Sequence, residues 1–524
     1  HGAVFVRLAA DHYQLDTADP SHWQLLRDVL GAHAPSHVVH LLALDAPSIE
    51  ADDTLDRAQR LCCVSSLHLL QAIAAQGWSK PPRLTFVTRG AQAAAASSDV
   101  TQPSQALVWG FAGSAAQEYP ELQIKLIDLG PTTSDEVDLL AQELLQVDGE
   151  PRIALRHGQR LAPRLQRSPR HTSGARERQI RADRTYLVSG GLGGLGLVVA
   201  ERLVSLGARH VALLSRSAPS SDKLAALQAL RDAGAQVHLV RADVAQRHEL
   251  ERALSTLRAS APPVDGVVHA AGVLDDATLA NLRAAQVLPV LTPKVLGAAL
   301  LTELLPELGF LVLFSSVTGV LGSAGQSAYA AANAYLDAFA HQRAARGHRV
   351  SSLAWGGWAE VGMAHARAQN LQGTGLIAPA EGAELFERLL DARAPQLTLV
   401  ALDPRRLAAA PLLASHSLLR SLVQEQPQPQ ANDVGARARA AATPALRARV
   451  IEEYLLSAVG RVAGGAIPLS ASTPLKELGL DSLMLLNLRS LIARELGVEL
   501  GASTLLSLPS VEALTAHLVD TLSL

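Results

Sequence analysis

The stretch between residues 184 and 405 alternates short apolar runs with longer amphipathic segments. Apolar runs such as TYLVS, VALLS and FLVLF are followed by glycine or serine. Segments such as LVVAERLVSLG place apolar residues at helical spacing and end on glycine. Strand and helix signals that alternate over such a length predict a parallel sheet with helices on both faces. We therefore expect a doubly wound α/β domain here.

Three segments near the start of the chain repeat part of this plan. HVVHLLALDA resembles GVVHAAGVLDD, RLTFVTRGA resembles FLVLFSSVTG, and QIKLIDLG stands where VSSLAWGG stands in the second copy. The first copy contains no glycine-rich loop and begins partway through the fold. It predicts a second, truncated parallel sheet that is catalytically empty, in a chain cut from something longer.

The last part of the chain has a different character. Gln424–Arg437 alternates proline with glutamine, a composition that favours extended, semi-rigid chain over a packed core. Beyond it, helical patterns cover Leu446–Val462, the LMLLNLRSLIARELG segment and Val511–Leu522. With a fourth short helix in a loop, these segments predict an all-α four-helix bundle.

Composition excludes several classes of protein. Lys and Arg number 46 against 49 Asp and Glu, a net charge of −3, so there is no basic footprint for nucleic acid. Cys62 and Cys63 are the two cysteines, and a disulfide between neighbours is strained, which favours a reduced, cytoplasmic setting. The long uncharged stretch Leu308–Leu336 is rich in Ser, Gly, Gln and Asn. We interpret it as a strand, a loop and a helix start, not a membrane span.

A glycine-rich loop follows the strand predicted at Thr185–Val188. The sequence SGGLGGLG places Gly191, Gly193 and Gly196 at the G-x-G-x-x-G spacing, immediately before a helix. Such glycines let the backbone turn sharply and approach a pyrophosphate, which the helix N-terminus then stabilises. The strand before the loop and the helix after it support a dinucleotide site over an ordinary tight turn.

The end of the second strand indicates which dinucleotide is bound. An NAD site usually has Asp or Glu there, whereas this chain has Ser215 and Arg216. A guanidinium at this place pairs with a 2′-phosphate, so NADPH is favoured; the alternative is a solvated loop charge. The candidate cofactor-binding positions are Gly191, Gly193, Gly194, Leu195, Gly196, Ser215, Arg216, Asp243, Val244, Ala271 and Gly272.

Four polar residues suggest a ketone-reducing site beside this cofactor. Ser316 ends a strand, Tyr329 begins a helical run, Asn333 follows four residues later on the same face, and Lys294 lies upstream. A tyrosine can give its proton to the developing alkoxide while the serine hydroxyl orients the carbonyl. We expect the ammonium of Lys294 to lower the tyrosine pKa. Taken singly, each residue also fits a cap, a core aromatic or a surface charge.

These motifs resemble the short-chain dehydrogenase/reductases over residues 184–405. The usual Tyr-x-x-x-Lys pattern is Tyr329-x-x-x-Asn333 here, with the lysine at position 294. That exchange, with HAAGVLDD and LAWGGW around it, resembles the ketoreductase domains of modular polyketide synthases. The resemblance implies a structural subdomain (1–165) and a catalytic subdomain (180–415), both Rossmann-like. A linker (420–440) and an acyl carrier domain (444–524) would follow.

The carrier resemblance rests on the GLDSL sequence before the LMLLNLRSLIARELG helix. Alone, Ser482 would be interpreted as an ordinary helix N-cap. The motif resembles the phosphopantetheine attachment site of acyl carrier proteins, which implies a covalent 4′-phosphopantetheine on Ser482. Its partners would be a phosphopantetheinyl transferase, other synthase domains and a β-ketoacyl chain on the arm.

The resemblance therefore implies NADPH-dependent reduction of a carrier-tethered β-ketoacyl thioester. The Leu274-Asp275-Asp276 loop resembles that of the class giving a D-configured (3R) alcohol, while Leu321 replaces the Trp of the other class. Ala324 and Ala328 depart from the usual Pro and Asn of the first class. The alternatives are a silent reductase scaffold with carrier function alone, and a stand-alone reductase of small ketones.

Overall fold

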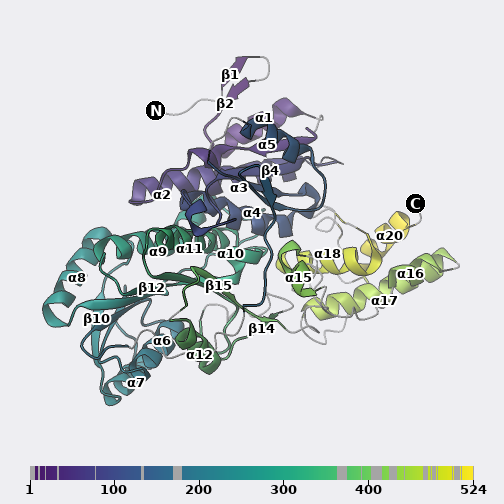
Figure 1. Cartoon of the computed structure of the whole chain (residues 1–524). Helices are drawn as coiled ribbons and strands as arrows, with labels where there is room; N and C mark the ends of the chain where they lie inside the picture. Colours follow the sequence, from purple (N-terminus) through teal and green to yellow (C-terminus); the bar gives the residue numbers. More distant parts are fainter. Residues whose placement is uncertain are drawn as a thin grey trace.

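The computed structural model shows two parallel sheets and a helical unit (Figure 1). It describes residues 6–9, 12–17, 19–31, 35–76, 78, 80–131, 135–168, 180–362, 374–390, 392–402, 416–423, 434–441, 443–463, 470–472, 474, 480, 482–498, 500, 508 and 510–522.

The first unit contains a five-stranded sheet. A hairpin of β1 (Val6–Ala9) and β2 (His12–Gln14) precedes it. The strand order is β3 (His37–His40), β4 (Arg83–Arg89), β5 (Lys125–Leu129), β6 (Arg152–Arg156) and β7 (Gln159–Leu161), parallel except for β7. The helices are α1 (Pro20–Leu30), α2 (Asp52–Gln59), α3 (Ser65–Gln76), α4 (Ala106–Glu118) and α5 (Glu136–Leu145).

The second unit is a seven-stranded, all-parallel sheet. Its order is β10 (Gln236–Arg241), β9 (His210–Ser215), β8 (Thr185–Ser189), β11 (Val264–His269), β12 (Phe310–Ser316), β13 (Val350–Trp355) and β15 (Gln396–Leu399). The helices are α6 (Gly194–Ser205), α7 (Ser221–Asp232), α8 (Arg247–Ser260), α9 (Ala284–Leu304), α10 (Val317–Leu321), α11 (Ser327–Ala345) and α12 (Pro379–Leu389). β14 (Thr374–Gly375) pairs with β16 (Ala401–Leu402), and α15 (Arg420–Val423) comes later.

The doubly wound fold is confirmed, and so is the truncated repeat. The strand order of the second sheet reverses between β8 and β11, which opens a crevice at their carboxyl ends. The first sheet has counterparts only of the later strands, because β3, β4 and β5 correspond to β11, β12 and β13. The uncharged stretch after residue 308 forms β12 and the start of α11, as expected, but the short helix α10 occupies part of the expected loop.

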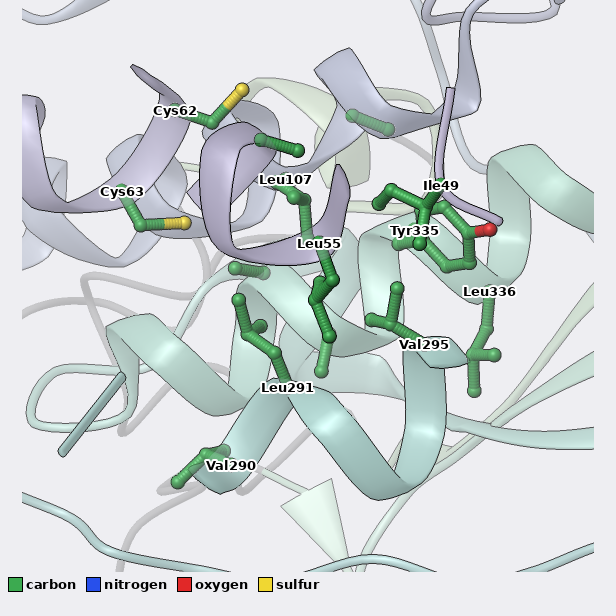
Figure 2. Packing of buried hydrophobic residues seen from close by; sticks show 14 of the residues in the cluster. Ile49, Leu55, Cys62, Cys63, Leu107, Val290, Leu291, Val295, Tyr335 and Leu336 are labelled. Atoms are coloured by element: carbon green, nitrogen blue, oxygen red, sulfur yellow. The ribbon is translucent and has the colours of Figure 1, made fainter. Parts of the chain in front are cut away.

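The two α/β units share one hydrophobic core. Figure 2 shows Ile49, Leu55 and Leu107 of the first unit among Val295 and Tyr335 of the second. The helices α4 and α11 approach so closely that a Cβ on Gly110 would lie 2.1 Å from the carbonyl oxygen of Ala330. The first unit is therefore packed directly on the helix that carries Tyr329.

The shared core contains both cysteines and the long apolar helix α9. Cys62 and Cys63 are buried free thiols. One described helix, α9, is long and apolar enough to cross a membrane, but 56% of that window is buried within the protein, as in a core helix. Pro289 and Pro293 also lie within α9.

The C-terminal unit is helical, and one prediction for it is wrong. It comprises α16 (Val434–Arg439), α17 (Pro444–Ala463), α18 (Ser482–Leu496) and α20 (Val511–Leu522). The predicted linker at 420–440 therefore ends in a helix, because Ala438 enters the apolar core and Arg439 donates to the Leu496 carbonyl. Residues 424–433, and most of the loop expected to hold a fourth short helix, lie outside the described residues.

Candidate active site and carrier helix

The glycine loop connects β8 to α6 in a conformation that side chains would obstruct. A Cβ on Gly196 would lie 2.3 Å from the Gly190 carbonyl oxygen, and one on Gly191 would lie 2.7 Å from that of Val188. Gly193 is the N-cap of α6, which begins at Gly194 and Leu195. The loop therefore brings bare backbone and a helix N-terminus to the crevice, as a pyrophosphate site requires.

A cleft of about 590 Å³ lies beyond the carboxyl ends of β9 and β10. Arg216 and Arg241 both line it, and the Arg241 Nε donates to the Arg216 carbonyl oxygen at 3.4 Å. Ser215 ends β9, so the predicted Ser–Arg pair lies at this cleft. Sequence reasoning missed Arg241, although it ends the next strand and could have been found by aligning strand ends.

The remaining cofactor candidates surround the same crevice. Asp243 lines the arginine cleft, and its Oδ1 accepts a hydrogen bond from the Ala245 amide at 2.9 Å. Val244 is buried against Gly297 of α9. Ala271 and Gly272 follow β11, and the Cα of Ala271 lies close to Gly190 of the glycine loop.

Ser316, Tyr329, Asn333 and Lys294 come together from three elements. Ser316 ends β12 and caps α10, Tyr329 is in the first turn of α11, and Lys294 extends from α9. The Lys294 Nζ lies 5.4 Å from the centre of the Tyr329 ring. The Asn333 amide donates to the Tyr329 carbonyl oxygen at 2.8 Å. The four residues predicted to form the reducing site therefore lie close together in the folded protein.

The expected lowering of the Tyr329 pKa is wrong for this structure. Burial raises the pKa of Tyr329 to about 12, and hydrogen bonds with Asn333 and Ser316 oppose the rise. Burial also lowers the pKa of Lys294 to about 7, against the attraction of Asp337. Desolvation, together with the nearby Asp276 carboxylate, therefore outweighs the two hydrogen bonds that favour the phenolate.

Two groups that sequence reasoning missed fix Lys294 in place. Its ammonium donates to the Phe314 carbonyl oxygen at 2.6 Å, and its own carbonyl oxygen accepts from His269 Nε2 at 3.1 Å. His269 Nδ1 in turn meets the Ser189 hydroxyl at 2.6 Å. Burial lowers the pKa of His269 to about 4, so the ring is neutral and structural.

Asp337 is a third buried group near Lys294 that sequence reasoning missed. It lies two turns after Tyr329 on α11, and burial raises the pKa of its carboxyl to about 7.

The loop Leu274–Asp276 lies beside the catalytic helix. Asp275 is exposed and accepts a hydrogen bond from the side-chain amide of Gln286 at 2.9 Å. Asp276 accepts one from the side-chain amide of Gln326 at 2.8 Å, and Gln326 is three residues before Tyr329. The two carboxylates are therefore held by hydrogen bonds and are not simply solvated.

Ser482 is the first residue of α18. The first turn of a helix is where the helix dipole stabilises an anion such as a phosphate. Leu480 is buried, while positions 479 and 481 of the GLDSL motif lie outside the described residues.

Three family models match consecutive parts of the chain. A model described as "Polyketide synthase extender module SpnB, Rossmann fold domain" matches residues 6–165. The KR domain model matches residues 184–360, and a model of the phosphopantetheine attachment site matches residues 453–518.

Curated relatives and solved structures agree with these models. Polyketide synthase GfsA of Streptomyces halstedii is 37% identical over 93% of this chain, and Erythronolide synthase EryA3 of Saccharopolyspora erythraea is 35% identical over 87%. The chain spans only 7% and 14% of their lengths. A solved A-type ketoreductase from a modular polyketide synthase is 32% identical, with a TM-score of 0.70 over 77% of this chain and 86% of that one. A C2-type ketoreductase is also 32% identical, with a TM-score of 0.67 over 77% and 88%.

Proposed function

Because this chain belongs to the ketoreductases of modular polyketide synthases and carries a carrier domain, we propose that it reduces a β-ketoacyl thioester to the β-hydroxyacyl thioester. The growing chain is held on a phosphopantetheine arm at Ser482. The observation that carries the proposal is the convergence of Ser316, Tyr329 and Lys294 beside a glycine loop. A silent scaffold would lack one of these groups.

The residues at the crevice fit NADPH. The glycine loop leaves the space that a pyrophosphate needs, and Arg216 and Arg241 supply charge for a 2′-phosphate. When bound, NADPH supplies the hydride for the reduction. The contacts of this chain would be with its phosphates and ribose, from the loop, the arginine cleft and the segment after β11.

The chain's own groups handle the substrate oxygen and its proton. The Ser316 hydroxyl orients the ketone oxygen, and the Tyr329 phenol donates its proton to that oxygen as negative charge develops. Lys294 stabilises the phenolate that remains, from 5.4 Å beneath the ring. Asn333 is fully buried and donates to the Tyr329 carbonyl, which fixes the first turn of α11.

Several finer assignments belong to the same proposal. The domains are 1–165, 180–415 and 444–524, and the segment between the last two ends in the helix α16. A phosphopantetheinyl transferase modifies Ser482, other synthase domains exchange acyl groups with the arm, and the reaction takes place in the cytoplasm. The product is the D-configured alcohol, because the Leu274–Asp276 loop resembles that of the ketoreductase class giving this alcohol, and it stands beside Gln326 at the start of the catalytic helix. Tethering raises the local concentration of substrate at the reductase.

The proposal is tested by replacing Tyr329 with Phe and following reduction of a diketide β-ketothioester with NADPH. We expect a loss of about 10²-fold or more in kcat, as removal of a general acid gives, with NADPH binding retained. The matched control is Tyr335→Phe, the same change on the same helix at a residue buried in the core. Wild-type rates in Tyr329→Phe would show that another acid does the chemistry, and an inactive wild type would favour the scaffold alternative.

A further inference from the structure

Glu118 is a buried carboxylate of the catalytically empty unit that binds the catalytic one. It is the last residue of α4. Its Oε2 accepts from the Leu279 amide at 2.7 Å, and its Oε1 accepts from the Gly325 amide at 2.9 Å. Both amides belong to loops of the second unit, so each carboxylate oxygen holds a different loop.

These two loops flank the candidate active site. Leu279 is three residues beyond Asp276, and Gly325 is four residues before Tyr329. The loops are also joined directly, because the Ala277 amide donates to the Gly325 carbonyl oxygen at 3.0 Å. The Gln326–Asp276 hydrogen bond lies next to this pair. Glu118 thus binds where the end of the Leu274–Asp276 loop meets the segment that leads into Tyr329.

Neighbouring residues of the first unit also form hydrogen bonds to these loops or to residues next to them. Gln71 of α3 donates to the Leu279 and Leu282 carbonyl oxygens at 2.8 and 2.9 Å. Gln117 donates to the Leu321 carbonyl oxygen at 3.0 Å, and the Ser114 hydroxyl accepts from the Ser323 amide at 3.1 Å. These contacts are neutral, whereas that of Glu118 is charge-assisted and therefore stronger.

Burying a carboxylate costs folding free energy, so stability alone does not explain Glu118. Burial raises the pKa of Glu118 to about 7, while the two backbone hydrogen bonds and the nearby Arg489 lower it. Without this carboxylate, the backbone amides of Leu279 and Gly325 would lack a hydrogen-bond acceptor between the two units. What the carboxylate provides is a fixed separation between two amides, one in each loop.

We propose that Glu118 is a positioning residue, which sets the geometry of Asp276 and Tyr329 from the empty unit. This inference rests on the proposed reductase function for its kinetic consequence. Its structural consequence, the fixing of residues 274–283 and 322–328, holds whether or not the site is active.

The test compares Glu118→Gln with Glu143→Gln in the intact chain. A glutamine accepts one amide hydrogen and turns its own NH₂ toward the other, so one loop is released. Glu143 is a matched control, because it is also buried in the first unit but binds Lys125 and Arg160, far in sequence from both loops. Both variants should lower the melting temperature.

Only Glu118→Gln should change the site. We expect faster amide hydrogen exchange in both loops, a roughly 10- to 100-fold loss in kcat, as misplacement of reacting groups gives, and a less stereopure alcohol. The KM for NADPH should stay nearly unchanged, because the two side-chain hydrogen bonds of Glu118 go to residues 279 and 325 and not to the glycine loop or the arginine cleft. Glu143→Gln should retain wild-type loop exchange, kcat and product ratio.

Three outcomes separate the possibilities. Unchanged loop exchange and unchanged product ratio in folded Glu118→Gln would overturn the positioning role. Equal losses in the two variants would mean that the first unit supplies stability alone, which also overturns it. An inactive wild type in which Glu118→Gln still loosens both loops would support the positioning role and contradict the proposed reductase function.

Discussion

At the scale of single residues, the proposed cofactor preference rests on Arg216 and Arg241. Both line the cleft at the ends of β9 and β10, where a 2′-phosphate would lie. The sequence pointed to Arg216 because it stands where an NAD site has a carboxylate. Arg241 is adjacent only because β9 and β10 pair in register, from Gln236 with His210 to Arg241 with Ser215.

We therefore expect each arginine to contribute to NADPH preference. Arg216→Ala should lower kcat/KM for NADPH about 10-fold or more while leaving that for NADH nearly unchanged, since only NADPH carries the extra phosphate. Arg241→Ala should act in the same direction. Arg231→Ala, at the end of α7, is the control for loss of an exposed arginine. Equal values for the two cofactors in the wild type would refute the assignment.

The buried Lys294 shows what residue types alone do not reveal. Its spacing from Tyr329 gave no indication that burial would lower its own pKa and raise that of the tyrosine. The lysine pKa depends on burial and on Asp337, and the tyrosine pKa on burial and on groups from other elements, Ser316 and Asp276 among them. A pKa direction is thus a property of the assembled site, whereas the proposal of Tyr329 as the proton donor needed only the sequence.

At the scale of elements, the strands and the catalytic helix could be predicted because their patterns are local. The run before Ser316 is β12, and Tyr329 lies in the first turn of α11, as expected. The helix α16 could not be predicted, because the polar composition around it favours extended chain. It forms through contacts with distant residues, such as that of Arg439 with the Leu496 carbonyl.

The helix α18 carries the prediction for the carrier. Since Ser482 is the first residue of this helix, it stands where the helix dipole would stabilise a phosphodiester. Incubation with coenzyme A and a phosphopantetheinyl transferase should add one phosphopantetheine, seen by intact mass spectrometry. Ser482→Ala should abolish the addition, and Ser490→Ala, later on the same helix, should not. A folded wild-type chain that stays unmodified would argue against the carrier assignment.

At the scale of the whole molecule, we expect the contact between the two α/β units to influence the stereochemistry of the reduction. The Leu274–Asp276 loop lies at their junction, and its neighbour Leu279 is held by Gln71 and Glu118 of the first unit. That arrangement could not be predicted from either repeat alone, because the contacts join residues more than 150 positions apart. The sequence did indicate which unit is catalytic, since only one has the glycine loop.

The expected product of the intact molecule is the D-alcohol. Chiral chromatography of the reduced diketide thioester measures it directly. Asp276→Ala removes the Gln326 partner and should erode the D preference, whereas Asp232→Ala, an exposed residue at the end of α7, should not. A predominantly L-alcohol from the wild type would mean that these loop carboxylates do not guide substrate entry.

The close approach of the two units has a consequence for recombining synthase modules. Gly110 leaves no room for a Cβ beside Ala330, and a Cβ on Gly322 would lie 2.4 Å from the Gly113 carbonyl oxygen. A reductase half transplanted onto a foreign partner would meet side chains in these places unless the partner also offers bare backbone there. The two α/β units should therefore be exchanged together when synthase modules recombine. In natural or engineered synthases, recombination that leaves the reductase functional should occur outside this pair, toward the segment before the carrier domain.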